Sequence, residues 1–217
     1  MWTSGQSSPM TAGRVTTRRR LTATARAAVA AGIVGMISNL LLVGFYAWQV
    51  GRPEHGSWLG PANDLVGSVG TAFGVVVAVG LGPLLPQRFM ARAANLVGIA
   101  SMVALTILGP LLVAGVVSFE VQSPIAVGCF LVLAGWLLLV NRWLRGVIRG
   151  RVTRLGAWSG AAVLVGAGVL GLGFLLAVVR LPLYAVGGLL VICGMLAIPI
   201  WFLLLGHRLP MVDVDSR

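Results

Sequence analysis

The sequence predicts an all-α integral membrane protein, a polytopic transmembrane bundle of six helices with both termini in the cytoplasm. Of its 217 residues, 58% are hydrophobic and only 10% are charged, whereas about 25% of the residues in a typical soluble domain carry a charge. Six uncharged apolar runs are each about 20 residues or longer, which is enough to cross roughly 30 Å of hydrocarbon as a helix. The arginines, in addition, are concentrated in alternate connections between these runs.

The chain divides into a tail, a membrane domain and a second tail. Residues 1–25 are rich in Ser, Thr, Gly and Arg, so we expect a disordered basic cytoplasmic tail, within which Met10 offers an alternative start. Residues 26–208 hold the six spans, and residues 209–217 form a short cytoplasmic tail. The predicted spans, in chain order, are Ala27–Val50, Leu65–Leu85, Ala93–Phe119, Val121–Val140, Leu155–Val179 and Leu181–Leu205. They lack the alternation of a membrane β-barrel, so helices are the remaining way to satisfy the backbone in lipid.

Polar and helix-breaking residues separate the runs. Residues 51–56 end the first run, and Pro86 with its polar neighbours ends the second. Residues 120–124 divide the third run from the fourth. Residues 142–154 are expected to form the longest inner connection, and residues 180–182 a very short turn before the last span.

The placement of the arginines predicts the orientation. With the N-terminus inside the cell, all 16 basic residues except Arg52 and Arg180 fall in cytoplasmic segments, as the positive-inside bias requires. The exclusive use of arginine, without lysine, indicates a GC-rich bacterial genome, so the cell inner (plasma) membrane is the expected location. The first span exceeds the 7–15 apolar residues of a signal peptide and is expected to stay uncleaved, although residues 17–21 are similar to a twin-arginine export signal.

Several function classes are disfavoured by residues that the spans lack. No Asp, Glu, Arg or His lies within the six runs, whereas proton-coupled carriers and intramembrane metalloproteases depend on such residues. Cys129 and Cys193 lie in apolar runs, where we expect them to behave as small hydrophobes, and no metal-binding spacing is present. The net charge of +11 does not indicate a nucleic-acid partner, because the arginines lie in short connections and not on a soluble basic face. We therefore expect no enzyme activity, no metal and no cofactor.

One short motif suggests a protease and is discounted. Ala157-Trp158-Ser159-Gly160 loosely resembles the G-x-S-G nucleophile motif of rhomboid-type intramembrane serine proteases. The first Gly of that motif is replaced, and the two histidines of the chain, His55 and His207, lie outside the spans. Without a base in the membrane the hydroxyl would not be activated, so Ser159 is expected to be a small packing residue.

Polar side chains in and beside the spans are the candidates for a binding site. Asn39 in the first span, Asn95 in the third and Asp64 before the second are the best candidates for a solute path. A structural interpretation competes with this one, because amides in membranes commonly hydrogen-bond between helices. Asn63 and Asp64 could likewise cap the first turn of the second span.

A stripe of small residues recurs every four positions on the second span: Gly70, Gly74, Ala78 and Gly82. Such stripes let helix backbones approach closely, so packing within the chain is the first interpretation. Contact with another subunit and the lining of a solute path stay open. Pro110 and Pro199 lie inside predicted spans and should kink them, since proline removes a backbone donor.

Five arginines surround the connection between the fourth and fifth spans: Arg142, Arg145, Arg149, Arg151 and Arg154. In the predicted topology they face the cytoplasmic leaflet, where each attracts anionic lipid headgroups with about 1 kcal/mol. We therefore expect contact with anionic lipid here, and a protein partner at this connection is the alternative.

Three segments resemble sequences of uncharacterised multi-pass integral membrane proteins of high-GC bacteria: Gly60–Gly67, Arg92–Asn95 and Pro199–Leu209. The resemblance covers most of the chain after the N-terminal tail. Because that group carries no assigned activity, it supports the multi-pass architecture and implies no functional residue.

Two function classes follow from these observations. The first is a non-catalytic membrane component that packs with itself, as a homo-oligomer, or with a membrane partner. The second is a small permease or channel for a neutral or apolar solute. A cavity at mid-membrane that touches Asn39 or Asn95 would favour transport, and a solid bundle with an apolar groove would favour a partner.

Overall fold

The computed structural model describes residues 9–51, 58–148, 150–176 and 179–212, and within these ranges the chain is helical and contains no strand. Six helices are long and apolar enough to cross a membrane, which confirms the predicted six-span architecture. Their bounds are α1 Pro9–Gly51, α2 Leu59–Leu81, α3 Phe89–Val113, α4 Phe119–Trp143, α5 Gly150–Leu175 and α6 Arg180–Arg208. Short 3-10 turns follow three of them: Gly82–Leu84 after α2, Leu144–Gly146 after α4 and Leu209–Met211 after α6.

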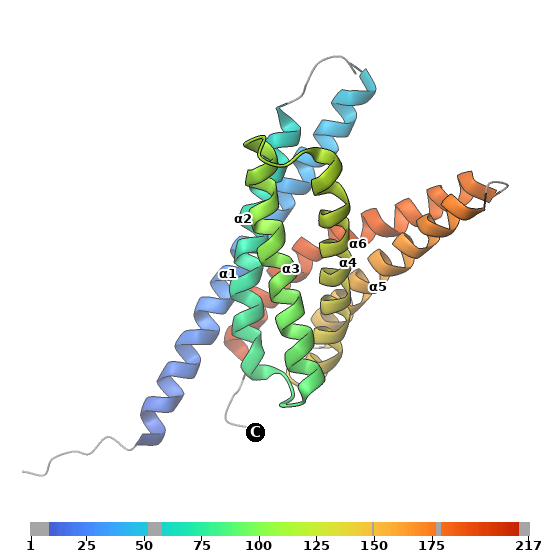
Figure 1. The fold of residues 1–217 in the computed structure, drawn as a ribbon. Coiled ribbons are helices and arrows are strands. Elements are labelled where there is room, and N and C mark those ends of the chain that lie inside the picture. Colours follow the sequence, from blue (N-terminus) through green and yellow to red (C-terminus); the bar gives the residue numbers. More distant parts are fainter. Residues whose placement is uncertain (1–8, 52–57, 149, 177–178, 213–217) are drawn as a thin grey trace, which may run out of the picture.

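The six helices form a closed ring. Each helix contacts the next one in the chain, and α6 returns to contact α1. The start of α1, the α2–α3 and α4–α5 connections and the end of α6 lie together at the lower end of Figure 1. We call this the arginine-rich end, because nearly every described arginine lies there. Arg180, at the start of α6, lies at the opposite end.

The buried core occupies the half of the ring nearest the arginine-rich end. In α4 every buried residue lies between Leu133 and Asn141, and none of residues 119–132 is buried. In α1 residues 33–49 contain no buried residue either. Large apolar side chains are exposed all around the bundle, for example Leu40 at 69% and Leu181 at 80%, as expected where hydrocarbon is the solvent.

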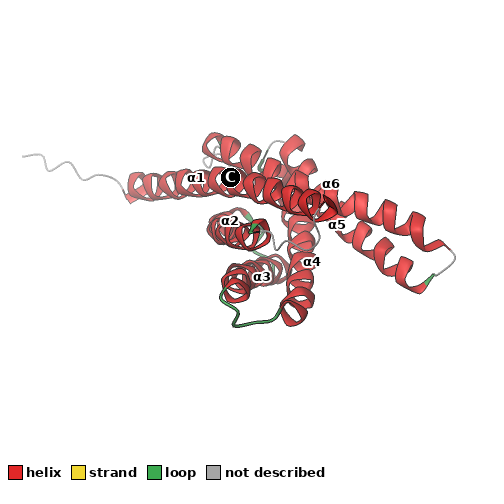
Figure 2. Ribbon diagram, turned by 90° about the horizontal axis from the view of Figure 1, so that it is seen from above, coloured by secondary structure: helices red, strands yellow, loops and turns green. Residues whose placement is uncertain are grey.

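The hairpin of α5 and α6 is held together by close backbone contacts at glycine. A Cβ on Gly166 would lie 2.7 Å from the carbonyl oxygen of Gly187, and one on Gly187 would lie 2.8 Å from that of Gly166. Gly194 approaches the carbonyl of Ser159 in the same way, at 2.9 Å. In Figures 1 and 2 the far end of this hairpin leans away from α1–α4. The hairpin therefore joins the ring through its half nearest the arginine-rich end.

The disordered tail predicted for residues 1–25 is wrong for residues 18–25. Helix α1 begins at Pro9, and Leu21, Thr24 and Ala25 are buried. The side chain of Thr24 packs against Gly80 of α2, and the backbone carbonyl of Ala25 lies against Gly206 of α6. Composition alone does not reveal such partners. Residues 1–8 lie outside the described part of the chain.

The break between the third and fourth spans lies earlier than the predicted residues 120–124. Helix α3 ends at Val113, and Gly115 adopts a φ of +70°. The N–H of Val116 donates to Leu111 O and that of Gly115 to Leu112 O, both at 3.0 Å. This pair of bonds is a Schellman motif, which ends a helix at a left-handed glycine. Glu120 and Pro124 consequently lie within the first turns of α4.

Three further boundaries differ from prediction. Helix α2 begins at Leu59, so Asn63 and Asp64 lie inside it and do not cap it. The connection expected over residues 142–154 is mostly helical, because α4 continues to Trp143 and α5 begins at Gly150. The expected break at residues 51–56 falls mostly on residues that lie outside the described chain. The very short turn expected at residues 180–182 is wrong, because helix α6 begins at Arg180 and these residues form its first turn.

The glycine contacts of the hairpin lead to a stability prediction. We expect Gly166→Leu to separate α5 from α6 and to lower the free energy of unfolding by about 1–3 kcal/mol, because the added atoms meet backbone. Gly168→Leu is the matched control, since nothing lies within 4 Å of a Cβ there, and it should change little. Denaturation in detergent, followed by circular dichroism, measures both. Equal effects of the two substitutions would contradict the close-contact explanation.

Candidate functional site

A half-open cavity of about 120 Å³ is lined by residues of α1, α2, α3, α4 and α6. Its lining is apolar apart from two hydroxyl groups and one amide. The lining residues are Ala31, Gly35, Ser38, Asn39, Gly67, Gly70, Thr71, Gly74, Met102, Phe130, Leu133, Met195, Ile198, Pro199 and Phe202. The volume suits a small organic molecule or a few water molecules, because an engineered cavity of about 150 Å³ holds benzene.

The cavity lies deep in the membrane-spanning part of the bundle. Thr71, Met102 and Phe130 each lie near the middle of their helices, and Asn39 lies in the last third of α1. Along α1, Asn39 is separated from Arg26, the last arginine before the apolar run, by roughly 20 Å of helix. A molecule in the cavity would therefore be surrounded by spans and not by the polar connections.

Asn39 is the polar residue of the cavity with an unfilled hydrogen bond. Its Nδ2 is shielded from solvent and has no partner among the described residues. The neighbouring Ser38 donates its hydroxyl proton to Asn63 Oδ1 of α2 at 2.7 Å, so it is engaged in helix packing. An amide donor without a partner in an apolar setting costs about 1–3 kcal/mol, and a ligand with an acceptor atom would recover part of that cost.

Pro199 forms another part of the cavity wall. Pro199 of α6 lies against Gly35, whose Cβ would be 2.9 Å from Pro199 Cγ, and its carbonyl lies 2.8 Å from a Cβ on Gly32. Only glycine allows this approach of α1 to α6. Because proline has no N–H, the carbonyl of Met195, one turn earlier, lacks its helical donor. Met195 and Pro199 both line the cavity.

Below the cavity, two tryptophan–asparagine pairs close the arginine-rich end. Trp136 of α4 donates to Asn95 Oδ1 of α3 at 3.0 Å, and Asn95 Nδ2 donates to Ala78 O of α2 at 3.1 Å. Trp201 of α6 donates to Asn141 Oδ1 of α4 at 2.9 Å. The two indole rings meet edge to face, with centroids 6.2 Å apart, a favoured aromatic geometry. This cluster links four helices through buried polar groups.

The cluster separates the residues predicted to line a solute path. Asn39 lines the cavity, whereas Asn95 is buried outside it and both of its polar groups have protein partners. Asp64 lies near the opposite end of α2 and is not among the lining residues. Trp136, Trp201 and Asn141 were not singled out by sequence reasoning, because two of them look like ordinary members of apolar runs and Asn141 like the end of one.

The small-residue stripe of α2 packs within the chain and also borders the cavity. Gly70 faces Val34 of α1, and Gly74 faces Met102 of α3, with contacts of 3.4 and 3.2 Å to an added Cβ. Both glycines line the cavity. Ala78 is fully buried, and a Cβ on Gly82 would lie 3.5 Å from Asn95 Nδ2. Packing within the chain and cavity lining, which the sequence left open, therefore occur together.

The structure also places the serine, the cysteines and the connection arginines that the sequence analysis singled out. Ser159 is fully buried, and its hydroxyl donates to Leu155 O at 2.8 Å. Cys129 and Cys193 are free thiols. Four of the arginines around the α4–α5 connection have exposed side chains: Arg142, Arg145, Arg151 and Arg154. Arg149 lies outside the described residues. Within the described chain, no group of three or more His, Cys, Asp or Glu side chains could hold a metal ion.

Comparison with known proteins yields no relative: no protein-family model, no curated protein and no solved structure matches this chain.

The Trp–Asn cluster leads to a second stability prediction. Trp201→Phe keeps an aromatic ring but leaves Asn141 Oδ1 without its donor in a dry interior, so the free energy of unfolding should fall by about 1–3 kcal/mol. Trp158→Phe is the control, because Trp158 is 50% exposed, and it should have little effect. Unfolding by sodium dodecyl sulfate in mixed micelles measures the difference. A Trp158 variant as damaged as the Trp201 variant would show that the buried hydrogen bond is not the cause.

Proposed function

We propose that the chain is a non-catalytic, multi-pass membrane protein that binds a small, uncharged, largely apolar solute with a hydrogen-bond acceptor in its mid-span cavity, and acts as a permease for it. The unpartnered Nδ2 of Asn39 is the observation that carries this proposal. Apolar walls select an uncharged molecule, because a charge would lose its hydration without finding a counter-charge. The amide then distinguishes a solute with an acceptor from a pure hydrocarbon.

The chemistry of the lining supports binding without catalysis. The polar side chains at the cavity are an amide and two hydroxyls, and none of its lining residues is titratable. General acid–base or nucleophilic catalysis needs a group that can exchange a proton or be activated by a base. The cavity residues offer hydrogen bonds and shape only.

The uneven packing of the ring supports movement of the solute. The Trp–Asn cluster and the buried core close the cavity toward the arginine-rich end. Toward the opposite end, residues 119–132 of α4 and 33–49 of α1 contain no buried side chain. A site that is sealed on one side and loosely packed on the other fits one state of an alternating-access cycle.

A second candidate is association with a membrane partner or a second copy. The observation that favours it is the uncovered apolar half of α4, where Val121, Ile125 and Val127 are each about half exposed. Counting subunits by photobleaching in sparsely loaded liposomes separates the two candidates. Monomers throughout would argue against self-association and leave the permease proposal intact.

The orientation in the proposed bacterial plasma membrane can be tested by labelling. In a background with Cys129→Ala and Cys193→Ala, we expect Glu120→Cys to react with a membrane-impermeant maleimide on intact cells and Arg145→Cys to be protected, because basic segments stay in the cytoplasm. Permeabilised cells provide the control, in which both sites should react. Labelling of Arg145→Cys on intact cells would reverse the proposed orientation.

Ligand binding can be tested with two molecules of the same shape. Cyclopentanone has an acceptor oxygen that methylenecyclopentane lacks, so the protein in nanodiscs should prefer the ketone by about fivefold, the effect of one hydrogen bond. Asn39→Leu should abolish that preference, and Gln122→Leu, outside the cavity, should retain it. Saturation-transfer NMR, corrected with empty nanodiscs, gives the ratio.

Transport is then measured as flux of a panel of neutral solutes into proteoliposomes, with the Asn39→Leu protein as the blank. An unchanged ligand preference in Asn39→Leu would refute the binding site. Binding without flux for any solute in the panel would leave a receptor and refute the permease.

A further inference from the structure

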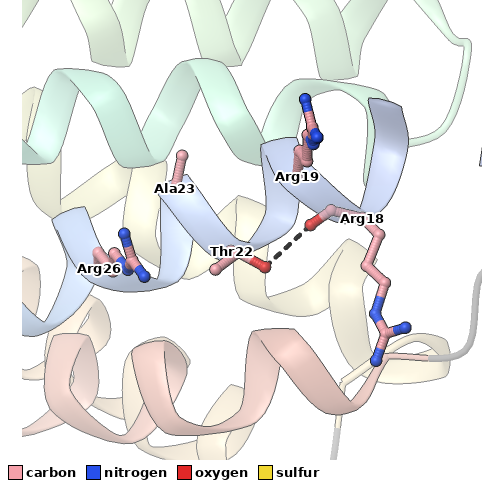
Figure 3. A pocket seen from close by; sticks show the side chains of 5 residues that line it. All are labelled: Arg18, Arg19, Thr22, Ala23 and Arg26. Carbon is pink, nitrogen blue, oxygen red and sulfur yellow. Dashed lines mark hydrogen bonds between the residues drawn. The ribbon is translucent and has the colours of Figure 1, made fainter. Parts of the chain in front are cut away.

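A surface pocket lies on the first exposed turns of α1, away from the cavity. Its volume is about 480 Å³, and its lining residues are Arg18, Arg19, Thr22, Ala23 and Arg26. In Figure 3, Arg18 and Arg19 lie at one end of the pocket and Arg26 at the other, with Thr22 and Ala23 between them. The positions of Arg19 and Arg26 are two helical turns apart, roughly 10 Å, a span that two long arginine side chains can bridge around a phosphate-sized group.

Among the described residues, no carboxylate lies near the arginines of this pocket. All three arginine side chains are exposed. The acidic residues of the described chain are Asp64 and Glu120, and both lie toward the opposite end of the bundle. The end of α6 contacts α1, and its last turn carries the basic residues His207 and Arg208 rather than an acidic one. A planar guanidinium binds phosphate oxygens in pairs and keeps its charge at all relevant pH values, so the chemistry favours a phosphate-bearing anion.

The apolar surface that follows the pocket on α1 points to a lipid and not to a free ion. Arg26 immediately precedes the apolar run, so the pocket lies at the boundary between polar connections and spans. Val29, Ile33 and Leu40 continue along the same helix face as Thr22 and Arg26, by their spacing. They are 36%, 51% and 69% exposed. An acyl chain could lie along this strip while its headgroup occupies the pocket.

We propose that Arg18, Arg19 and Arg26 form a binding site for the phosphate headgroup of an anionic phospholipid, with one acyl chain along Val29 and Ile33. This site is distinct from the exposed arginines around the α4–α5 connection, which we expect to attract anionic lipid as a diffuse charge. The proposal does not depend on solute binding at Asn39.

Two triple variants with the same change of charge test the site. Arg18→Gln/Arg19→Gln/Arg26→Gln removes the pocket cations, and Arg142→Gln/Arg145→Gln/Arg154→Gln removes three exposed cations from the same end of the bundle. Native mass spectrometry of the full chain, titrated with dioleoylphosphatidylglycerol, gives the affinity for the first bound lipid. We expect the pocket variant to bind about tenfold more weakly or worse, and the control variant to stay close to wild type. Binding of dioleoylphosphatidylcholine should be the same in all three proteins.

A third variant separates the shape of the pocket from its charge. Ala23→Trp fills the space between the arginines and leaves every charge in place, and Ala23 is exposed, so the fold should tolerate it. It should weaken binding of the first phosphatidylglycerol as the pocket variant does. Equal losses in the two triple variants, or full binding by Ala23→Trp, would overturn the pocket in favour of diffuse attraction. Displacement of the lipid by millimolar inorganic phosphate would overturn the lipid assignment.

Discussion

Hydrocarbon offers no hydrogen-bond partner, so each polar group within the spans depends on a partner supplied by the chain itself. The Trp–Asn cluster satisfies this constraint with side chains from three helices and a carbonyl from a fourth. Asn95 accepts from Trp136 and donates to Ala78 O, while Asn141 accepts from Trp201 and donates to Leu137 O. The serines and threonines donate within their own helices or across one interface, as Thr24 and Ser159 do to carbonyls four residues earlier. Among the shielded side-chain atoms of the described residues, Asn39 Nδ2 alone lacks a partner, and it lies at the cavity.

The same constraint, together with close contacts at glycine, explains why the ring is tightly packed near the arginine-rich end and looser at the opposite end. Gly166 and Gly187 allow the backbones of α5 and α6 to come into contact. Such close contacts restrict the movement of one helix relative to the other. The α5–α6 hairpin is therefore one unit. It is attached to the other helices near the arginine-rich end, where Trp201 reaches Asn141 and Gly206 meets Ala25. The cavity therefore lies where the attached part of the hairpin gives way to the part that leans outward, and Pro199 stands at this position on α6.

The six spans can be predicted from the sequence because the transfer free energies of about 20 apolar residues add up over each run. It fails where the result depends on one partner far along the chain. Asn39 and Asn95 look alike in the sequence, each an amide in an apolar run. Asn95 is satisfied by Trp136, 41 residues later, while no described residue fills the same role for Asn39 Nδ2. The sequence alone therefore does not distinguish the asparagine that lines the cavity from the one that pairs with a tryptophan.

The boundary errors have the same origin. Residues 18–25 resemble a disordered tail because they are short of large apolar side chains, yet the side chain of Thr24 and the backbone of Ala25 pack against Gly80 and Gly206. Helix α3 ends at Val113 because Gly115 adopts a left-handed conformation. The break was predicted later, at Glu120 and Pro124, because a charge and a proline are stronger sequence signals than one glycine.

The size and position of the cavity together limit what the protein can recognise. A volume of about 120 Å³ excludes a whole lipid, and the apolar walls exclude an ion, because hydroxyls and one amide cannot replace a hydration shell. Discrimination among the neutral molecules that remain must come from Asn39, whose hydrogen bond is worth about 1 kcal/mol, and from shape. Asn39 belongs to α1 and Pro199 to α6, so a solute that contacts both would join the fixed helices to the leaning hairpin. Binding would then favour whichever arrangement of the hairpin brings the two walls to the solute, since a ligand shifts a conformational equilibrium by its difference in affinity between the two states. In the proposed permease, the unsatisfied amide of Asn39 and the proline inside α6 would thus connect recognition of a solute to movement of the bundle.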